Sequence, residues 1–201
     1  MLKLKTFKGG YDSNLSYILF NSESKEAVII DTALDPGILL EFIDKNSLQL
    51  KFAVVMHSHF DHRVNLEHYK GNNITLCGSE KLPFEVDKRL KDGDELGFGS
   101  YRIKVISAPG HTPDCILLYA DGKLFTTDVL FIDGCGRCDL KGGDVEQMYE
   151  TLEMIKKFPD ETVIYPGHDY GRIPFAALGD QKKTNPYLMA KDKDEFVEER
   201  M

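Results

Sequence analysis

Short apolar runs separated by polar turns cover most of the 201-residue chain, and their length is typical of β-strands. In 101–107, apolar Tyr101, Ile103 and Val105 alternate with basic residues, which indicates a strand with one buried face. The pair Asp121-Gly122 predicts a tight hairpin turn between two further runs. The expected strands are 1–5, 15–20, 27–30, 51–56, 74–77, 101–107, 115–119, 123–126 and 161–165.

Apolar residues at helical spacing follow the strands in each half of the chain. Pro36 begins a segment in which Ile38, Leu39, Phe42 and Ile43 are expected to share one face. Because helices follow strands in each half, we expect an α/β fold of two sheets with helices outside, in one domain over 1–201. The other expected segments are helices at 64–70 and 145–158, a turn-rich stretch at 82–96 and a charged, solvated helix at 191–201.

The composition is that of an ordinary globular protein, with 42% hydrophobic and 29% charged residues. A net charge of −8 argues against a nucleic acid or an anionic membrane as the main partner. No run approaches the roughly 20 apolar residues of a membrane-spanning helix, and the first residues lack a signal-peptide pattern. We therefore expect a cytoplasmic protein that acts on a small molecule.

Four cysteines, at 77, 115, 135 and 138, do not suggest a disulfide framework in a chain expected in the cytoplasm. Cys135-Gly136-Arg137-Cys138 has the spacing of a C-x-x-C motif. As a zinc motif it lacks a second pair, and as a redox motif it lacks the strand-to-helix setting. We expect Cys138 to be a small buried side chain.

The most informative segment is His57-Ser58-His59-Phe60-Asp61-His62, which places three of the six histidines within six residues. Imidazole and carboxylate groups are ligands for first-row metals. The segment directly follows the apolar run 51–56, so these side chains are expected at the end of a strand, where α/β folds place their sites. The pattern predicts a metal centre.

Three further candidate ligands also follow apolar runs: His111 and His168, each after a Pro-Gly pair, and Asp128. Convergence of these strand ends would gather seven side chains, more than one tetrahedral zinc requires. The set suits two metals that share a bridging carboxylate. His68 is left over and is expected at the surface or behind the ligands. The seven candidates are His57, His59, Asp61, His62, His111, Asp128 and His168.

These motifs, in this order, resemble the metallo-β-lactamase superfamily, and the resemblance spans roughly residues 12 to 190. It implies an αββα sandwich, two mixed sheets flanked by helices, with the metal site at the edge of the sheets. The segment 131–137, Phe-Ile-Asp-Gly-Cys-Gly-Arg, is similar to one shared by glyoxalase II-like thioesterases (hydroxyacylglutathione hydrolases) and persulfide dioxygenases. The runs at 168–172 and 182–186 resemble the dioxygenases and compact thioesterase-like members.

The chain departs from the family pattern at three points. Arg63-Val64 stands where small residues or glycine are usual, and Thr127 replaces the usual glycine before the bridging Asp128. Neither change removes a ligand. The C-terminal helical domain with which classical glyoxalase II binds glutathione is not expected here, so the thiol carrier is left open.

For a hydrolase, the resemblance implies that His57, His59 and His111 hold one divalent ion and that Asp61, His62 and His168 hold the second. Asp128 would bridge them, and Asp61 and Asp128 would be the catalytic carboxylates. Zinc is the first expectation, with iron or manganese as alternatives. Metals lower the pKa of bound water toward about 7, which would make a nucleophile for a thioester available. Thiols have pKa values around 8.5, so the departing thiolate needs no strong general acid.

For a persulfide dioxygenase, the resemblance implies a different use of the same residues. His57, His111 and Asp128 would form a two-histidine, one-carboxylate face on a single Fe(II). The other four candidates would then surround the ligands, and the substrate would be a low-molecular-weight persulfide. The complete motif set favours the hydrolase, whereas the run after His168 favours the dioxygenase. A nuclease is disfavoured by the acidic charge, and a binding module by the complete ligand set.

Three residues are expected to contact the substrate: Arg137, Tyr170 and Arg172. Arg137 lies in a glycine-rich loop shortly after Asp128, where a bidentate contact with a carboxylate of the carrier is expected. Tyr170 follows His168 closely and is interpreted as either pocket or core. The lysines at 141, 182 and 183 are expected to be mainly solvated. A homodimer is expected only because dimers are the commonest assembly.

Overall fold

The apolar runs fold as two six-stranded sheets, in a computed structural model that describes residues 1–71 and 73–200. The first half of the chain contains β1 Leu2–Gly9, β2 Asn14–Asn21, β3 Glu26–Ile30, α1 Pro36–Lys45, β4 Gln49–Val55, η1 Phe60–His62, η2 Leu66–Tyr69, β5 Thr75–Ser79 and β6 Lys88–Leu90. The second half contains β7 Glu95–Phe98, β8 Tyr101–Ser107, β9 Ile116–Ala120, β10 Lys123–Thr127, β11 Leu130–Phe131, β12 Gly134–Cys135, α2 Val145–Ile155, β13 Val163–Pro166, β14 Ala176–Ala177, α3 Leu178–Thr184, α4 Pro186–Met189 and α5 Lys193–Arg200.

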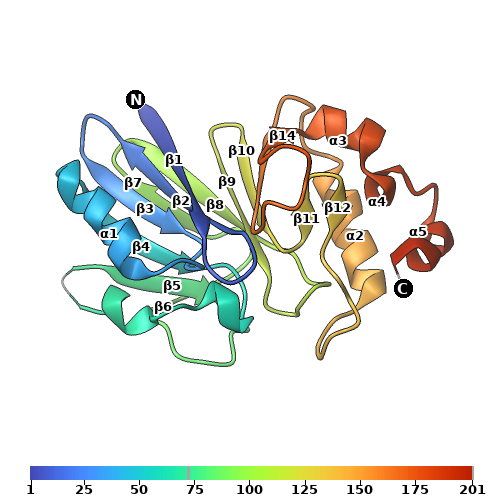
Figure 1. The fold of residues 1–201 in the computed structure, drawn as a ribbon, viewed down its shortest axis with the longest axis horizontal. Helices are drawn as coiled ribbons and strands as arrows, with labels where there is room; N and C mark the ends of the chain where they lie inside the picture. Colours follow the sequence, from blue (N-terminus) through green and yellow to red (C-terminus); the bar gives the residue numbers. More distant parts are fainter. Residues whose placement is uncertain (72, 201) are drawn as a thin grey trace.

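Both sheets are mixed. The first has the order β1-β2-β3-β4-β5-β6, antiparallel from β1 to β3 and parallel from β3 to β6. The second has the order β14-β13-β10-β9-β8-β7, in which only β10 and β13 are parallel. Figure 1 shows α1 at one end of the molecule and α2 to α5 at the other, with the sheets between them. The expected αββα sandwich is confirmed.

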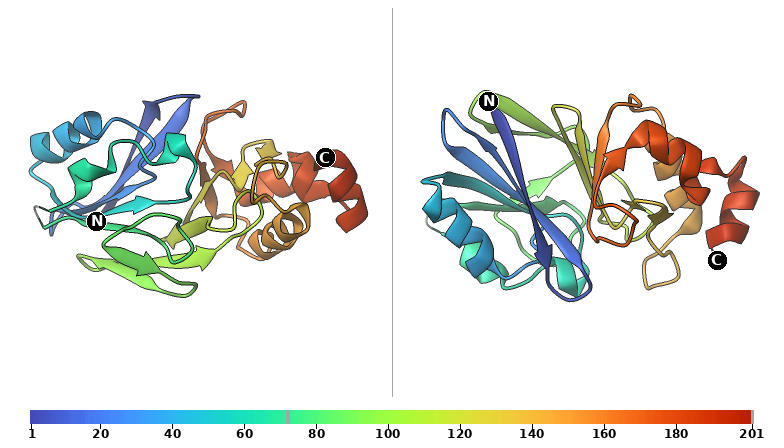
Figure 2. Two further views of the ribbon diagram at one scale, coloured as in Figure 1. Left: turned by 90° about the horizontal axis from the view of Figure 1, so that it is seen from below. Right: turned by 45° about the horizontal axis from the view of Figure 1, so that its top comes forward.

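Three clusters of buried apolar side chains hold these four layers together. The first lies between the sheets and includes Val54 of β4 and Leu118 of β9. The second packs Leu39 of α1 on the outer face of the first sheet, and the third packs Met148 of α2 on the outer face of the second. In both views of Figure 2, the N-terminal sheet and the C-terminal helices lie at opposite ends of the molecule. Most of the core side chains therefore come from the apolar runs that predicted the elements.

The hairpin predicted at Asp121-Gly122 is confirmed. It joins the antiparallel strands β9 and β10, and both turn residues have positive φ, 48° and 73°. Such a turn matches the twist of the two strands, and glycine adopts this conformation without steric cost. The hairpin sets the position of Asp128, which directly follows β10.

Some local predictions were wrong. The segment 82–96 contains the short strand β6 and the start of β7, because pairing with neighbouring strands outweighs its polar composition. The helix expected at 64–70 is reduced to the 3₁₀ turn η2. Ile38 does not share the buried face of α1, since half of its surface is exposed while Pro36 is buried.

The charged C-terminal helix is present as α5, and most of its side chains are exposed or half-buried, but it is not fully solvated. Phe196 of α5 is fully buried, with its ring centroid 5.6 Å from that of Tyr149 and 6.1 Å from that of Tyr187. One aromatic residue thus attaches an otherwise charged helix to the body of the protein. Met201, which the prediction included, lies outside the described residues. No helix within 1–71 and 73–200 combines the length and apolar character needed to cross a membrane.

Candidate metal centre

The candidate ligands all lie on loops that follow strands. His57 follows β4, and His59, Asp61 and His62 continue the same loop into η1. His111 lies between β8 and β9, while Asp128 and His168 follow the parallel strands β10 and β13. The two sheets present these loops at one edge, so residues more than 100 positions apart in sequence become neighbours.

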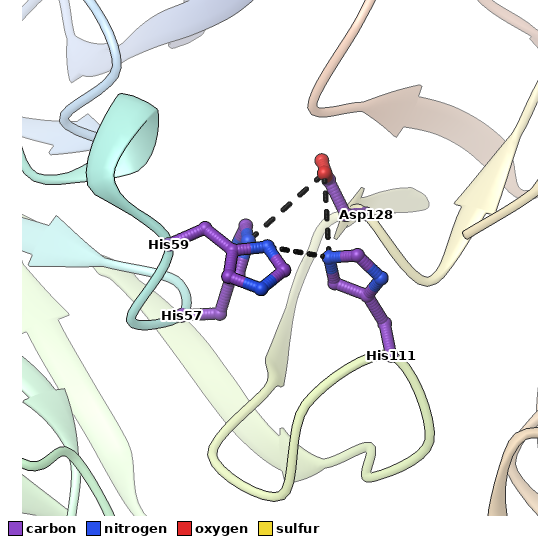
Figure 3. A group of neighbouring side chains, drawn as sticks. All are labelled: His57, His59, His111 and Asp128. Carbon is purple, nitrogen blue, oxygen red and sulfur yellow. Dashed lines mark hydrogen bonds and ion pairs between the residues drawn. The ribbon is translucent and has the colours of Figure 1, made fainter. Parts of the chain in front are cut away.

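One group of ligands consists of His57, His59, His111 and Asp128, whose candidate ligand atoms lie within 4.8 Å of one another. Figure 3 shows these side chains pointing toward a common centre from three loops. Nε2 of His111 is 2.8 Å from Nδ1 of His59 and 3.6 Å from Oδ2 of Asp128. The arrangement offers three imidazole nitrogens and one carboxylate oxygen to a single cation.

The second group consists of Asp61, His62 and His168. The Nε2 atoms of the two histidines are 3.1 Å apart, and Oδ2 of Asp61 is 3.6 Å from each of them. Asp128 lies between the groups, with Oδ1 3.3 Å from Nε2 of His62 and Oδ2 3.3 Å from Nε2 of His168. Asp128 therefore occupies the position of a carboxylate shared by two cations.

Four of the five histidines in the two ligand groups have their outer nitrogen, Nδ1, within hydrogen-bond distance of an oxygen. The partners are Thr127 Oγ1 at 3.1 Å for His57, Asp31 Oδ1 at 2.8 Å for His62, the Arg137 carbonyl at 2.7 Å for His111 and the Asp12 carbonyl at 2.7 Å for His168. Carbonyl and carboxylate oxygens only accept hydrogen bonds, so Nδ1 of His62, His111 and His168 donates, and Nε2 of each ring faces the centre. Metal-binding histidines are commonly oriented in this way.

The centre also contains buried polar atoms that no described residue satisfies. Nε2 of His57 and Oδ1 of Asp128 have no hydrogen-bond partner within the described part of the chain. Unsatisfied buried groups are costly, and a cation bound to these atoms would remove that cost. Neutral imidazoles with carboxylates are suitable ligands for zinc, iron and manganese. The residues thus fit two divalent ions.

Electrostatics divides the histidines into two kinds. Burial lowers the pKa of His57, His59 and His111, so these imidazoles are neutral and ready to bind a metal. Burial acts in the same direction on His62, but the charges of Asp31 and Asp128 outweigh it and raise its pKa to about 10. A metal at the second group would displace that proton, because imidazole binds metals in its neutral form.

Sequence reasoning missed residues that surround the ligands. Asp31, at the end of β3, is buried and accepts hydrogen bonds from His62 and, at Oδ2, from Thr127. Asn14 of β2 is fully buried and donates to Oδ2 of Asp61 at 3.1 Å. Polar residues at strand ends were a signal for Asp31, whereas nothing in the local sequence distinguishes Asn14. Gly167 is required, because a Cβ there would collide with Asp128.

Thr127 links the two groups of ligands. Its Oγ1 donates to Oδ2 of Asp31 at 2.9 Å and accepts from Nδ1 of His57 at 3.1 Å. The residue has a φ of 40°, a conformation that is unfavourable for a β-branched side chain. One buried carboxylate, Asp31, therefore orients His62 directly and His57 through Thr127.

Replacing Thr127 by Val keeps the shape of the side chain and removes the hydroxyl. We expect metal affinity to fall about 10- to 100-fold, the usual effect of losing a partner that orients a ligand. Competition with a chelator measures this affinity, and Thr127→Ser, which keeps the hydroxyl, is the matched control. Equal affinities for the Val and Ser variants would show that the hydroxyl does not orient His57.

A cavity of about 530 Å³ opens beside the centre. His111 and Asp128 line it together with Arg137, Tyr170 and Arg172, the three expected substrate residues. Tyr170 is half exposed and stacks on His168 at a centroid distance of 4.7 Å, so it belongs to the cavity wall and not to the core. The remaining histidine, His68, is exposed and lies outside both groups.

The four cysteines are buried and unpaired, including Cys138 as expected. Burial raises the pKa of the Cys135 and Cys138 thiols, so both remain protonated at neutral pH. These thiols are therefore poor nucleophiles and poor metal ligands, and the chemistry of this region rests on the histidines and carboxylates.

Comparison with known proteins gives consistent results. A family model described as the metallo-beta-lactamase superfamily matches residues 64–168. The chain is 33% identical over 193 residues to a mitochondrial persulfide dioxygenase from Bos taurus, covering 90% of this chain and 74% of the relative. It is 32% identical over 190 residues to a hydroxyacylglutathione hydrolase from Photobacterium profundum, covering 92% and 73%. The crystal structure of ETHE1 from Myxococcus xanthus superposes with a TM-score of 0.90 at 28% identity, covering 98% of this chain and 88% of that one.

Proposed function

The chain belongs to the metallo-beta-lactamase superfamily, and from this premise we propose that it hydrolyses the thioester of a small thiol carrier at a centre of two metal ions. Zinc is the proposed metal, with iron or manganese as alternatives. The acidic net charge of −8 supports a small-molecule substrate over a nucleic acid. A cytoplasmic location and a homodimer remain part of this proposal.

The observation that carries the proposal is the second group of ligands. Asp61, His62 and His168 converge as closely as the first group, and the outer nitrogen of each histidine is fixed by an oxygen. Asn14 also holds the Asp61 carboxylate. A two-metal hydrolase requires such a second set as metal ligands, whereas a single-metal enzyme would use these residues only behind its own ligands.

The reaction adds water to the thioester carbonyl, breaks the C–S bond and gives a carboxylic acid and a thiol. When bound, the two metals would polarise the carbonyl and make a water molecule acidic enough to attack at neutral pH. Asp128 would be the carboxylate that both ions share. His111 and Asp128 line the cavity, so a carrier bound there places its thioester against the centre. The departing thiol has a pKa near 8.5, so the site needs no dedicated acid.

Two assays on one preparation test the proposal. Release of free thiol from S-lactoylglutathione and from an acyl-pantetheine thioester measures hydrolysis, and oxygen consumption with glutathione persulfide measures dioxygenation. We expect metal-dependent release of thiol and no consumption of oxygen above the background. Oxygen consumption without any thioester cleavage would overturn the proposal.

The alternative is a persulfide dioxygenase with one Fe(II) held by His57, His111 and Asp128. Its specific support is the similarity of the chain to persulfide dioxygenases in sequence and in overall structure. Two of the three residues, His111 and Asp128, also face the cavity. In this case His59, Asp61, His62 and His168 would surround the iron ligands.

A further inference from the structure

Three arginines line the cavity beside the metal centre: Arg137, Arg172 and Arg200. The first two already have carboxylate partners. Arg137 donates from Nε and Nη2 to the two oxygens of Asp139, at 2.7 and 2.6 Å, and Arg172 donates to Asp133 at 3.1 Å. An anionic ligand would have to displace these partners before either arginine could bind it.

Arg200 reaches the same cavity from α5. Its Nη1 lies 3.4 Å from the hydroxyl of Tyr187, and its guanidinium carbon lies 5.6 Å from the centre of that ring. The buried ring of Phe196, one turn earlier in α5, fixes the helix against the body of the protein. The position of Arg200 is therefore set by packing and not by an ion pair.

Arg200 has weaker polar partners than the other two arginines of the cavity. Among residues 1–71 and 73–200, no carboxylate forms an ion pair with it, and its Nε is buried without a hydrogen-bond acceptor. The neighbouring thiols of Cys135 and Cys138 are neutral, because burial raises their pKa. Asp139 is close enough for its charge to interact with that of Arg200, but both of its oxygens accept hydrogen bonds from Arg137. A buried donor without an acceptor is unfavourable, so an anion supplied by a ligand would be stabilising.

We propose that Arg200 binds an anionic group of the thiol carrier, a carboxylate or a phosphate, and that α5 forms one wall of the carrier site. The carrier would then extend through the cavity from the metal centre, at His111 and Asp128, to Arg200. The identification of the ligand as a thiol carrier rests on the proposed function. The contribution of α5 goes beyond the proposed function, because no sequence pattern predicts this helix at the site.

Binding of carriers that cannot be cleaved tests the inference without any turnover. The probes are S-methylglutathione, S-methyl-4′-phosphopantetheine and S-methylpantetheine, titrated by calorimetry into the protein as purified. The last two differ only in a phosphate. We expect Arg200→Gln to weaken binding of at least one anionic probe about 10-fold or more, since hydrogen bonds between two charged groups are among the strongest that a ligand can lose. Binding of the neutral probe should not change.

Two further variants serve as controls for the effect of Arg200→Gln on binding. Lys193→Gln removes one positive charge from the same helix outside the cavity and should bind all probes like the wild type. Arg200→Lys keeps the charge and should recover part of the affinity. Whichever anionic probe responds identifies carboxylate or phosphate as the recognised group.

The inference is wrong if the wild type binds neither anionic probe, if Arg200→Gln binds them as well as the wild type, or if it weakens S-methylpantetheine equally. These outcomes are separate from the failure of the proposed function. Binding that depends on Arg200 in a protein that cleaves no thioester would support the carrier site and overturn only the hydrolase.

Discussion

Replacing Asp128 by Asn is expected to reduce thioester hydrolysis by at least about 10³-fold, since metal ions contribute several kcal/mol to the stabilisation of the transition state. Asp128 lies between the two groups of ligands, within 3.3 Å of Nε2 of both His62 and His168. An amide of the same shape has no negative charge to share between two cations. Both metals should therefore bind more weakly, which elemental analysis of the purified variant measures.

A control must show that the Asp128→Asn variant loses hydrolytic activity because it binds the metals weakly and not because it unfolds. Circular dichroism should show the wild-type secondary structure, because Asn fits the volume of Asp beside Gly167. A variant that retains two metals per chain and more than a tenth of the wild-type rate would contradict the role of Asp128 as the shared ligand.

Replacing His168 by Gln is expected to separate the two candidate reactions. In the two-metal hydrolase, the second group loses one of its three residues, so the chain should retain about one metal and lose about 10³-fold in thioester hydrolysis. In the single-iron dioxygenase, His168 would lie behind the iron ligands and would not bind the iron itself. The iron should then remain, and the rate should fall by about 10- to 100-fold, as for residues behind a metal ligand.

His68→Gln is the matched control, because it makes the same substitution at an exposed histidine outside both groups. We expect this variant to keep the wild-type metal content and rate. If His168→Gln retained two metals and the wild-type rate of hydrolysis, the second group would not be a metal site.

Much of the centre could be predicted from the sequence because its ligands are local signals. The segment 57–62 concentrates metal-binding groups in one loop, and the apolar run before it places that loop at a strand end. The same reasoning applied to His111, Asp128 and His168, since each follows a strand. Strand ends meet at one edge in this fold, so the pattern along the chain carried information about proximity in space.

The residues around the ligands could not be predicted in the same way. Asn14 and Asp31 act through hydrogen bonds to side chains 47 and 31 positions away, and such pairings depend on how the sheets pack. The sequence also does not show whether an arginine is free to bind a substrate or is already paired with an acidic residue. Arg137 and Arg172 were expected to bind substrate, but only the structure shows their acidic partners. Arg200 lies in a segment interpreted as solvated, because a single phenylalanine in a charged helix is a weak signal.

The proposed function depends most directly on how many metal ions each chain holds. Elemental analysis of protein purified without oxygen and without added metal measures this number. Two metals per chain, mainly zinc or a mixture of zinc and iron, is the result that the two-metal hydrolase predicts. One iron per chain, with the second group empty, would contradict it and would support the persulfide dioxygenase.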